Sequence, residues 1–160
     1  MAPTWFSLGP ISASPDGSRI AYSASLETPG YSFQVHVVKL DGTDLTLPIP
    51  AGAVFEDMPS WSNDGTRIVV SRGYAQDDSD MVLAVVPADG SGPGQETARG
   101  LTGYPNTADG WAPDDGSILA LPPGSNGAST QQLLLDPATL KTKPAPWTAN
   151  SPAAWQRAAR

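Results

Sequence analysis

His36 is the only histidine in the chain, and histidine is the side chain whose unperturbed pKa lies closest to neutral pH. It stands in the run Val35-His36-Val37-Val38, where the valines favour a strand and a structural role over that of a general base or metal ligand. A Ser-His-Asp hydrolase would depend on it, but the sequence has no Gly-x-Ser-x-Gly segment. We therefore expect no enzyme activity and predict no catalytic residue.

Two further segments contain residue types that bind ions. Asp77-Asp78-Ser79-Asp80 concentrates carboxylates, which Ca²⁺ prefers as ligands, but an EF-hand loop starting at Asp78 would place Leu83 where glycine is required. Gly90-Ser91-Gly92-Pro93-Gly94 is rich in glycine like a phosphate-binding loop, but Pro93 lacks an amide donor and no Lys-Ser or Lys-Thr pair follows. We expect both segments to be solvated loops, and we predict neither a metal site nor a cofactor.

Composition excludes several classes of partner and location. The chain of 160 residues has a net charge of -7, and its nine Lys and Arg residues are scattered singly. Without a basic stripe, nucleic acid is not an expected partner. The apolar stretch Met81–Val86 is far shorter than the roughly 20 residues that span a bilayer, so no membrane insertion is expected. Residues 1–5 contain no basic region followed by an apolar core, and we expect no signal peptide in this chain.

The elements that position these residues follow from a repeat in the sequence. Three segments align without gaps around a Pro-Asp-Gly-like turn, namely Ala13–Ile20, Trp61–Ile68 and Trp111–Ile118. Their aspartates Asp16, Asp64 and Asp114 are spaced by 48 and 50 residues, close to the roughly 40 to 50 typical of a propeller blade. An alternating run typical of a strand follows each isoleucine.

A second strand and a second turn follow in each copy. Val35–Leu40 runs into Asp41-Gly42, and Val82–Val86 into Asp89-Gly90, whereas the third copy has Gln132–Leu135 before a different turn. Proline presets φ and glycine accepts the left-handed conformation, so such turns suit tight antiparallel hairpins. With a strand before the first turn and a short fourth strand, each unit is predicted to be a four-stranded antiparallel blade of an all-β fold.

The pattern aromatic-Ser-Pro-Asp-Gly-x-x-Ile-Ala-Tyr, with a second strand ending in Asp-Gly, resembles the repeat of TolB-type, WD-like β-propellers. Its best copies are Ser14–Ser23 and Trp61–Ser71, while Ala13 and the displaced Gly116 depart from it. The resemblance implies a six-bladed ring in an exported protein of the bacterial envelope, hence a periplasmic or cell-surface location. Such propellers act as binding platforms or accompany peptidase domains. No residue here matches a catalytic motif of that family.

The chain is predicted to hold three blades, half of a six-bladed ring, in one domain of residues 1–160. The blades cover about residues 10–48, 58–103 and 108–148, and residues 149–160 begin a further blade or supply a closing strand. Three blades leave two apolar faces open, because a ring closes with four to eight. We expect a homodimer in which blade one of each chain packs on blade three of the other. Another closed oligomer, or half of a longer chain, is the alternative.

A second surface is predicted from the loops. The tight turns share one end of the blades, so the longer loops share the other, where an aromatic and acidic mix suits recognition. The candidate binding residues there are Tyr31, Phe55, Glu56, Tyr74, Asp77, Asp78 and Tyr104.

The function expected from these features is a non-catalytic module for protein binding or assembly that closes the ring with itself and takes another envelope protein as a further partner. One alternative is a glycan-binding propeller, whose sites would lie between blades and repeat with them. A second is a fragment of a propeller associated with a serine peptidase. A third is a chain made to study propeller assembly. Trp61, Trp111 and Trp155 recur at one position, which favours packing between blades over a ligand box.

Overall fold

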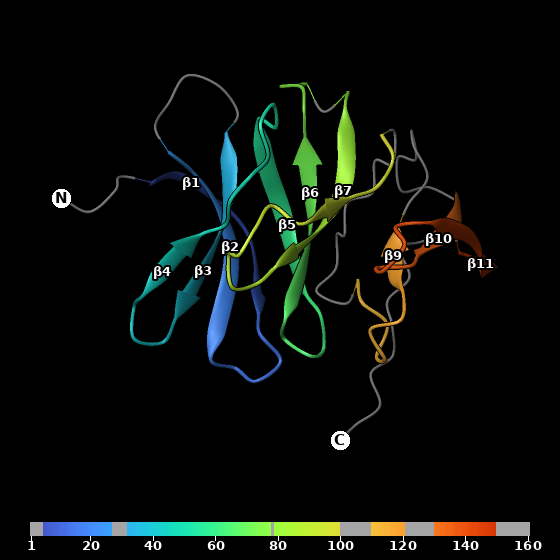
Figure 1. Ribbon diagram of the computed structural model, residues 1–160, viewed down its shortest axis with the longest axis horizontal. Coiled ribbons are helices and arrows are strands. Elements are labelled where there is room, and N and C mark those ends of the chain that lie inside the picture. The colour runs from blue at the N-terminus through green and yellow to red at the C-terminus, as the bar shows by residue number, and fades with distance from the viewer. Residues whose placement is uncertain (1–4, 27–31, 78, 100–109, 121–129, 150–160) are drawn as a thin grey trace.

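The computed structural model describes residues 5–26, 32–77, 79–99, 110–120 and 130–149. These residues form strands, turns and bends without a helix, so no helix in the described ranges is long and apolar enough to cross a bilayer. The strands form three antiparallel sheets that lie side by side, with the second sheet between the other two (Figure 1). The predicted all-β class is therefore confirmed, and the sheets are compatible with propeller blades.

In the first sheet, consecutive strands pair in the order β1-β2-β3-β4. Their bounds are Trp5–Ala13, Arg19–Leu26, Phe33–Lys39 and Asp44–Thr46. The hairpin turns are closed by Gly17 and Gly42, whose φ angles of 71° and 84° lie in the left-handed region that glycine adopts without strain. Consecutive pairing through tight turns is the expected result of the Pro-Asp-Gly and Asp-Gly signals.

The second sheet repeats this order with β5, β6, β7 and β8, and the third pairs β11-β10-β9. The bounds are Phe55–Trp61, Arg67–Gly73, Met81–Pro87 and Gln95–Glu96 for the second sheet, and Ile118–Ala120, Thr130–Leu135 and Thr142–Ala149 for the third. Trp111 forms an isolated bridge to Ile118 and stands where a first strand of the third sheet would lie. Within the described residues, the third sheet thus has three strands where four were expected.

β1 and β5 begin earlier than the predicted unit boundaries near residues 10 and 58. Trp5 pairs with Leu26, and Phe55 pairs with Gly73, so both first strands continue along the full length of their partners. Each pairing contains a register shift, between Leu8 and Ile11 in β1 and between Asp57 and Ser60 in β5. Such bulges hide the alternation by which a strand is recognised in sequence.

The second sheet buries apolar side chains on both faces. Ile68, Val70, Ala84 and Val86 pack toward the first sheet, in a cluster with its buried residues such as Val35. The alternate residues Val69, Leu83 and Val85 pack toward the third sheet, together with Trp111, Ile118 and Leu135. Since side chains alternate along a strand, this double covering explains why Met81–Val86 is a continuous apolar run.

The same tryptophan joint links both pairs of neighbouring sheets. The indole N–H of Trp61 donates to the Ser12 carbonyl at 3.0 Å, and that of Trp111 donates to the Ser60 carbonyl at 3.0 Å. The guanidinium of Arg19 lies 4.6 Å from the Trp61 ring centre, and that of Arg67 lies 4.9 Å from the Trp111 ring centre. The predicted packing role is confirmed for these two tryptophans, while Trp155 lies outside the described residues.

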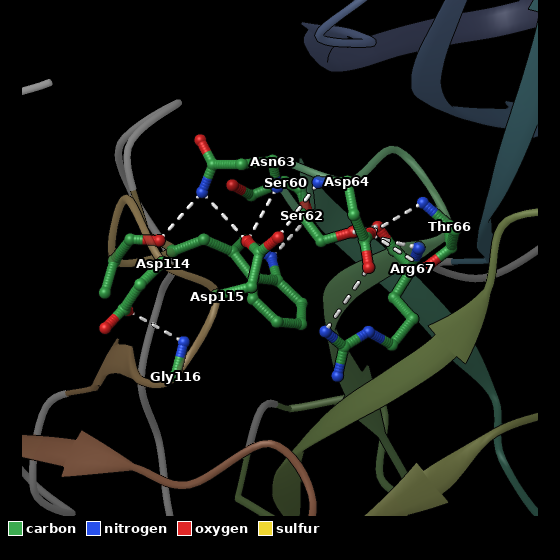
Figure 2. A network of polar contacts seen from close by, with 11 residues as sticks. Ser60, Ser62, Asn63, Asp64, Thr66, Arg67, Asp114, Asp115 and Gly116 are labelled. Carbon is green, nitrogen blue, oxygen red and sulfur yellow. Dashed lines mark hydrogen bonds and ion pairs between the residues drawn. The ribbon is translucent and has the colours of Figure 1, made fainter. Parts of the chain in front are cut away.

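Asp115 adds a second link between the second and third sheets (Figure 2). Its φ of 56° is left-handed, as are those of Gly17 and Gly65 at the same position in the other two turns. Its carboxylate accepts hydrogen bonds from Asn63 N at 2.7 Å, Asn63 Nδ2 at 2.8 Å and Asp64 N at 2.9 Å. Asp115, which displaces Gly116 in the repeat, therefore connects this turn to the turn of the second sheet by hydrogen bonds.

Candidate functional site

Four of the predicted binding residues lie within the described ranges, and they differ in exposure. Phe55 and Glu56 are 1% and 0% exposed and belong to β5, whereas the sequence placed them in a loop. Tyr74 is half-buried and Asp77 is exposed. Tyr31, Asp78 and Tyr104 lie outside the described residues.

The burial of Phe55 follows from its partner across the strands. It pairs with Gly73, where an added Cβ would lie 2.1 Å from the Phe55 ring, so the ring covers the glycine. The ring also packs with Phe33 of the first sheet and Met81 of β7. Phe55 therefore stabilises the contact between the first two sheets instead of facing solvent.

Glu56 and Tyr74 are brought together through two residues that the sequence did not single out, Arg72 and Glu96. We refer to these four residues as the Glu56–Arg72 cluster. Arg72 is fully buried and its guanidinium contacts Glu56 Oε1, through Nε at 2.7 Å and through Nη2. Its Nη1 lies 2.5 Å from Glu96 Oε1, which also accepts a hydrogen bond from the Tyr74 hydroxyl at 2.5 Å.

Cross-strand register creates this cluster. Glu56 stands opposite Arg72, and Glu96 on β8 is two strands away from β6. Arg72 lies on the same face as Val70, which packs toward the first sheet. The pairing joins residues far apart in the chain, so no local spacing in the sequence signals it.

The two carboxylates of the cluster titrate differently. Burial raises the pKa of Glu56 from 4.5 to about 7, despite the opposing charge of Arg72, and Glu96 raises it further. Its Oε2 atom is buried and has no hydrogen-bond partner among the described residues. Burial would also raise the pKa of Glu96, but hydrogen bonds from Tyr74 and Arg72 outweigh it and hold that pKa below its ordinary value. One ionised carboxylate thus neutralises Arg72, and the more buried one takes up a proton readily.

The solvent-facing side of the cluster carries a second ion pair. Arg99 contacts the Asp80 carboxylate, and its guanidinium lies 4.4 Å from the centre of the Tyr74 ring. Asp77 accepts a hydrogen bond from the Ser79 amide at 3.1 Å, which is the geometry of a loop turn. Within the described ranges, no three histidine or acidic side chains gather as a metal would need.

His36 lies on the outer face of the first sheet and is 4% exposed. Its ring stacks on Tyr22 at 5.1 Å between centres, and its Nδ1 lies 3.2 Å from Thr46 Oγ1 and 3.4 Å from Asp44 Oδ2. A catalytic triad has its hydroxyl and its carboxylate on opposite ring nitrogens, whereas here both approach the same one. Burial lowers the pKa of His36, although Asp44 opposes the change. These contacts favour a structural role.

Several apolar side chains on the outer face of the first sheet are exposed, beside the buried His36. Ile20 is 37% exposed there, whereas its equivalents Ile68 and Ile118 in the next two sheets are both 0% exposed. Ile11 and Leu8 on β1 are 69% and 65% exposed. At Ile20 the first sheet therefore exposes a position that the other two sheets bury against a neighbour.

A cavity of about 350 Å³ lies between the second and third sheets. It is lined in part by Thr66, Arg67, Gln95 and Pro137. At the corresponding place between the first two sheets, Leu45 occupies the position of Gln95, and its Cδ2 would lie 2.9 Å from a Cβ added to Gly90. The apolar side chain of Leu45 thus fills the joint between the first two sheets, whereas the polar side chain of Gln95 lines a cavity in the joint between the second and third sheets.

Comparison with protein-family models and with curated protein sequences gives no match. The resemblance to TolB-type propellers therefore stays a prediction.

Proposed function

We propose that this protein is a non-catalytic β-propeller module whose three sheets are blades, and that it closes a six-bladed ring with a second copy of itself. The observation that carries the proposal is the 37% exposure of Ile20 at a position where Ile68 and Ile118 are fully buried. An apolar position that is packed in every internal joint is expected to be packed at the remaining joint as well.

The opposite end of the chain offers the matching surface. Leu119 and Leu134 pair across β9 and β10, and both are half-buried. They take the places of Val69 and Val85, which the second sheet buries against the third. The chain thus carries one half of a blade joint at each end, and two copies related by a twofold axis would form two identical joints.

Solution mass tests this proposal directly. Light scattering should give about twice the 16.6 kDa of the chain. Ile20→Asp places a charge in the proposed joint and should yield a monomer, because an unpaired charge is costly to bury. Ala51→Asp is the matched control, since Ala51 is exposed in the turn between β4 and β5. A wild-type monomer would contradict the dimer and favour the alternative, in which further blades of a longer chain cover both faces.

Protein recognition is the second part of the proposal. Tyr74, Arg99 and Asp80 place aromatic and charged groups over the buried Glu56–Arg72 pair, at the end of the second sheet where the longer loops lie. Tyrosine and arginine are enriched where proteins bind one another. By the family resemblance, the partner is another protein of the bacterial envelope, and the module acts outside the cytoplasm. Crosslinking in envelope extracts, with Arg99→Ala as a variant that loses capture, would test this.

Glycan binding is a second candidate, favoured by the cavity between the second and third sheets. Its mixture of apolar and polar lining residues suits a small ligand at the lower end of the usual size range. A glycan array distinguishes glycan binding from protein binding. Glycan binding that is lost in Gln95→Ala and kept in Arg99→Ala would support a glycan site in the cavity.

A further inference from the structure

One leucine, one glutamine and one lysine occupy the same register position in the three sheets. Leu45 stands opposite Val37, Gln95 opposite Val85, and Lys143 opposite Leu134. The last strand of each sheet, namely β4, β8 and β11, thus places one side chain at the same register, and in the first two sheets this side chain lies on the face toward the following sheet.

In both internal joints this side chain lies on the side of the turn that precedes the last strand of the following sheet, in contact in the first joint and across a cavity in the second. Leu45 of the first sheet contacts Gly90 in the turn of the second sheet. Gln95 of the second sheet lines the cavity together with Pro137 and Ala138 in the turn of the third. By the same register, Lys143 of the third sheet would face the equivalent turn of a sheet packed after the third one.

The turn of the first sheet exposes an apolar side chain next to a carboxylate. Leu40 in this turn is 79% exposed, whereas Ala88 at the same position in the second sheet is 2% exposed and Pro137 in the third is buried. Asp41 follows and is exposed, with its carboxylate already holding the Thr43 amide at 2.9 Å. A lysine can lay its aliphatic stem on an apolar side chain and set its ammonium beside a carboxylate.

We propose that Lys143 of one copy packs over Leu40 and pairs with Asp41 of a second copy, which fixes the register in which the ring closes. The inference rests on the proposed ring and names the contact by which the two copies align. The Asp41 hydrogen bond to Thr43 holds the pKa of the carboxyl below its ordinary value, so it is ionised at neutral pH. Within each chain, Lys143 lies near Asp136, and Lys39 lies near Asp41, so each pair competes with the contact between copies.

Charge exchange tests the contact. Lys143→Glu and Asp41→Lys should each raise the dissociation constant of the dimer at least about tenfold, because each replaces an attraction with a repulsion in both joints. The double variant Lys143→Glu with Asp41→Lys should recover most of the affinity, since it restores opposite charges. All these positions are exposed, and circular dichroism of each variant establishes that the fold is kept.

Two controls carry the same charge changes at nearby exposed positions. Lys141→Glu lies two residues before Lys143, and Asp89→Lys lies in the equivalent turn of the second sheet. Both should leave the dissociation constant within about twofold of wild type. A dimer unaffected by the single changes, or not recovered by the double change, overturns the Lys143–Asp41 contact while the ring itself stands. A wild-type chain that is monomeric overturns both.

Discussion

At the residue scale, Glu56 shows how a fold can change the chemistry of a side chain. The carboxylate is fully buried, one of its oxygens has no hydrogen-bond partner in the described part of the chain, and Arg72 is shared with the more exposed Glu96. Two carboxylates beside one guanidinium leave an excess negative charge, which a proton on Glu56 removes. The cluster is therefore neutral overall when Glu56 is protonated, and this state suits a buried site.

This arrangement predicts a fall in stability between about pH 4.5 and pH 7. The folded protein keeps the Glu56 proton up to about pH 7, whereas the unfolded chain loses it near pH 4.5, so the unfolding free energy decreases as the pH rises through this window. The change should be on the order of 3 kcal/mol. Denaturant unfolding of wild type and Glu56→Gln across the window measures it, because the glutamine cannot ionise.

The comparison of the two proteins isolates Glu56 from the other titrating groups. Burial lowers the pKa of His36, so His36 decreases the unfolding free energy when the pH falls below the ordinary pKa of histidine. This pH dependence is opposite in sign to that of Glu56, and it is the same in wild type and Glu56→Gln. Parallel pH profiles for wild type and Glu56→Gln would show that the carboxyl is not protonated in the folded state.

Asp115 gives a second prediction at this scale, since it combines a strained backbone with useful contacts. Asp115→Gly removes the hydrogen bonds to Asn63 and Asp64 but relieves the left-handed φ of 56°, and should cost about 1 to 2 kcal/mol. Asp115→Ala loses the same bonds and keeps the strain, so it should cost about 1 kcal/mol more. Thermal unfolding of the two variants measures the difference. Equal stabilities would show that the backbone strain is negligible.

At the scale of the elements, the sequence predicts what is local and misses what depends on register. The turns at Gly17 and Gly42 and the strands beside them follow from short patterns, and the structure places them as expected. The burial of Glu56 depends on a strand that starts earlier than its alternation suggests and on an arginine of the next strand. In the sequence, Asp115 is only a departure from the repeat. Its hydrogen bonds could not be predicted because their donors belong to the turn of the neighbouring sheet.

The double covering of the second sheet predicts a gradient of local stability. β6 and β7 are buried on both faces, whereas β4 is exposed along its length. Amide hydrogens in the two buried strands should therefore exchange slowest, and those at the sheet edges fastest. Hydrogen exchange followed by mass spectrometry checks this order. Uniform protection across the first and second sheets would contradict the view that the second sheet is the most stable part of the described structure.

At the scale of the whole molecule, the proposed ring requires the first and third sheets each to supply half of a joint that the interior contains twice. The joint combines an apolar face, an indole hydrogen bond and a stacked arginine, as seen at Trp61 with Arg19. Ala13 stands where a tryptophan would occupy the first sheet, and it is exposed. In the proposed ring the closing joint would therefore lack the tryptophan contact, and its apolar contacts and the proposed Lys143 contact would hold the copies together.

Such a joint makes thermal stability depend on concentration. If the folded state is a dimer, unfolding also separates the copies, and dilution favours the unfolded chains. For a dimer of this size, the midpoint should rise by about 2 °C for each tenfold increase in protein concentration. Ile20→Asp should melt lower and at a midpoint independent of concentration, because its unfolding involves one chain only, whereas Ala51→Asp should follow the wild type. Calorimetry over a hundredfold range of concentration decides the matter, and superimposed wild-type transitions would mean that the exposed face of the first sheet is stable without a second copy.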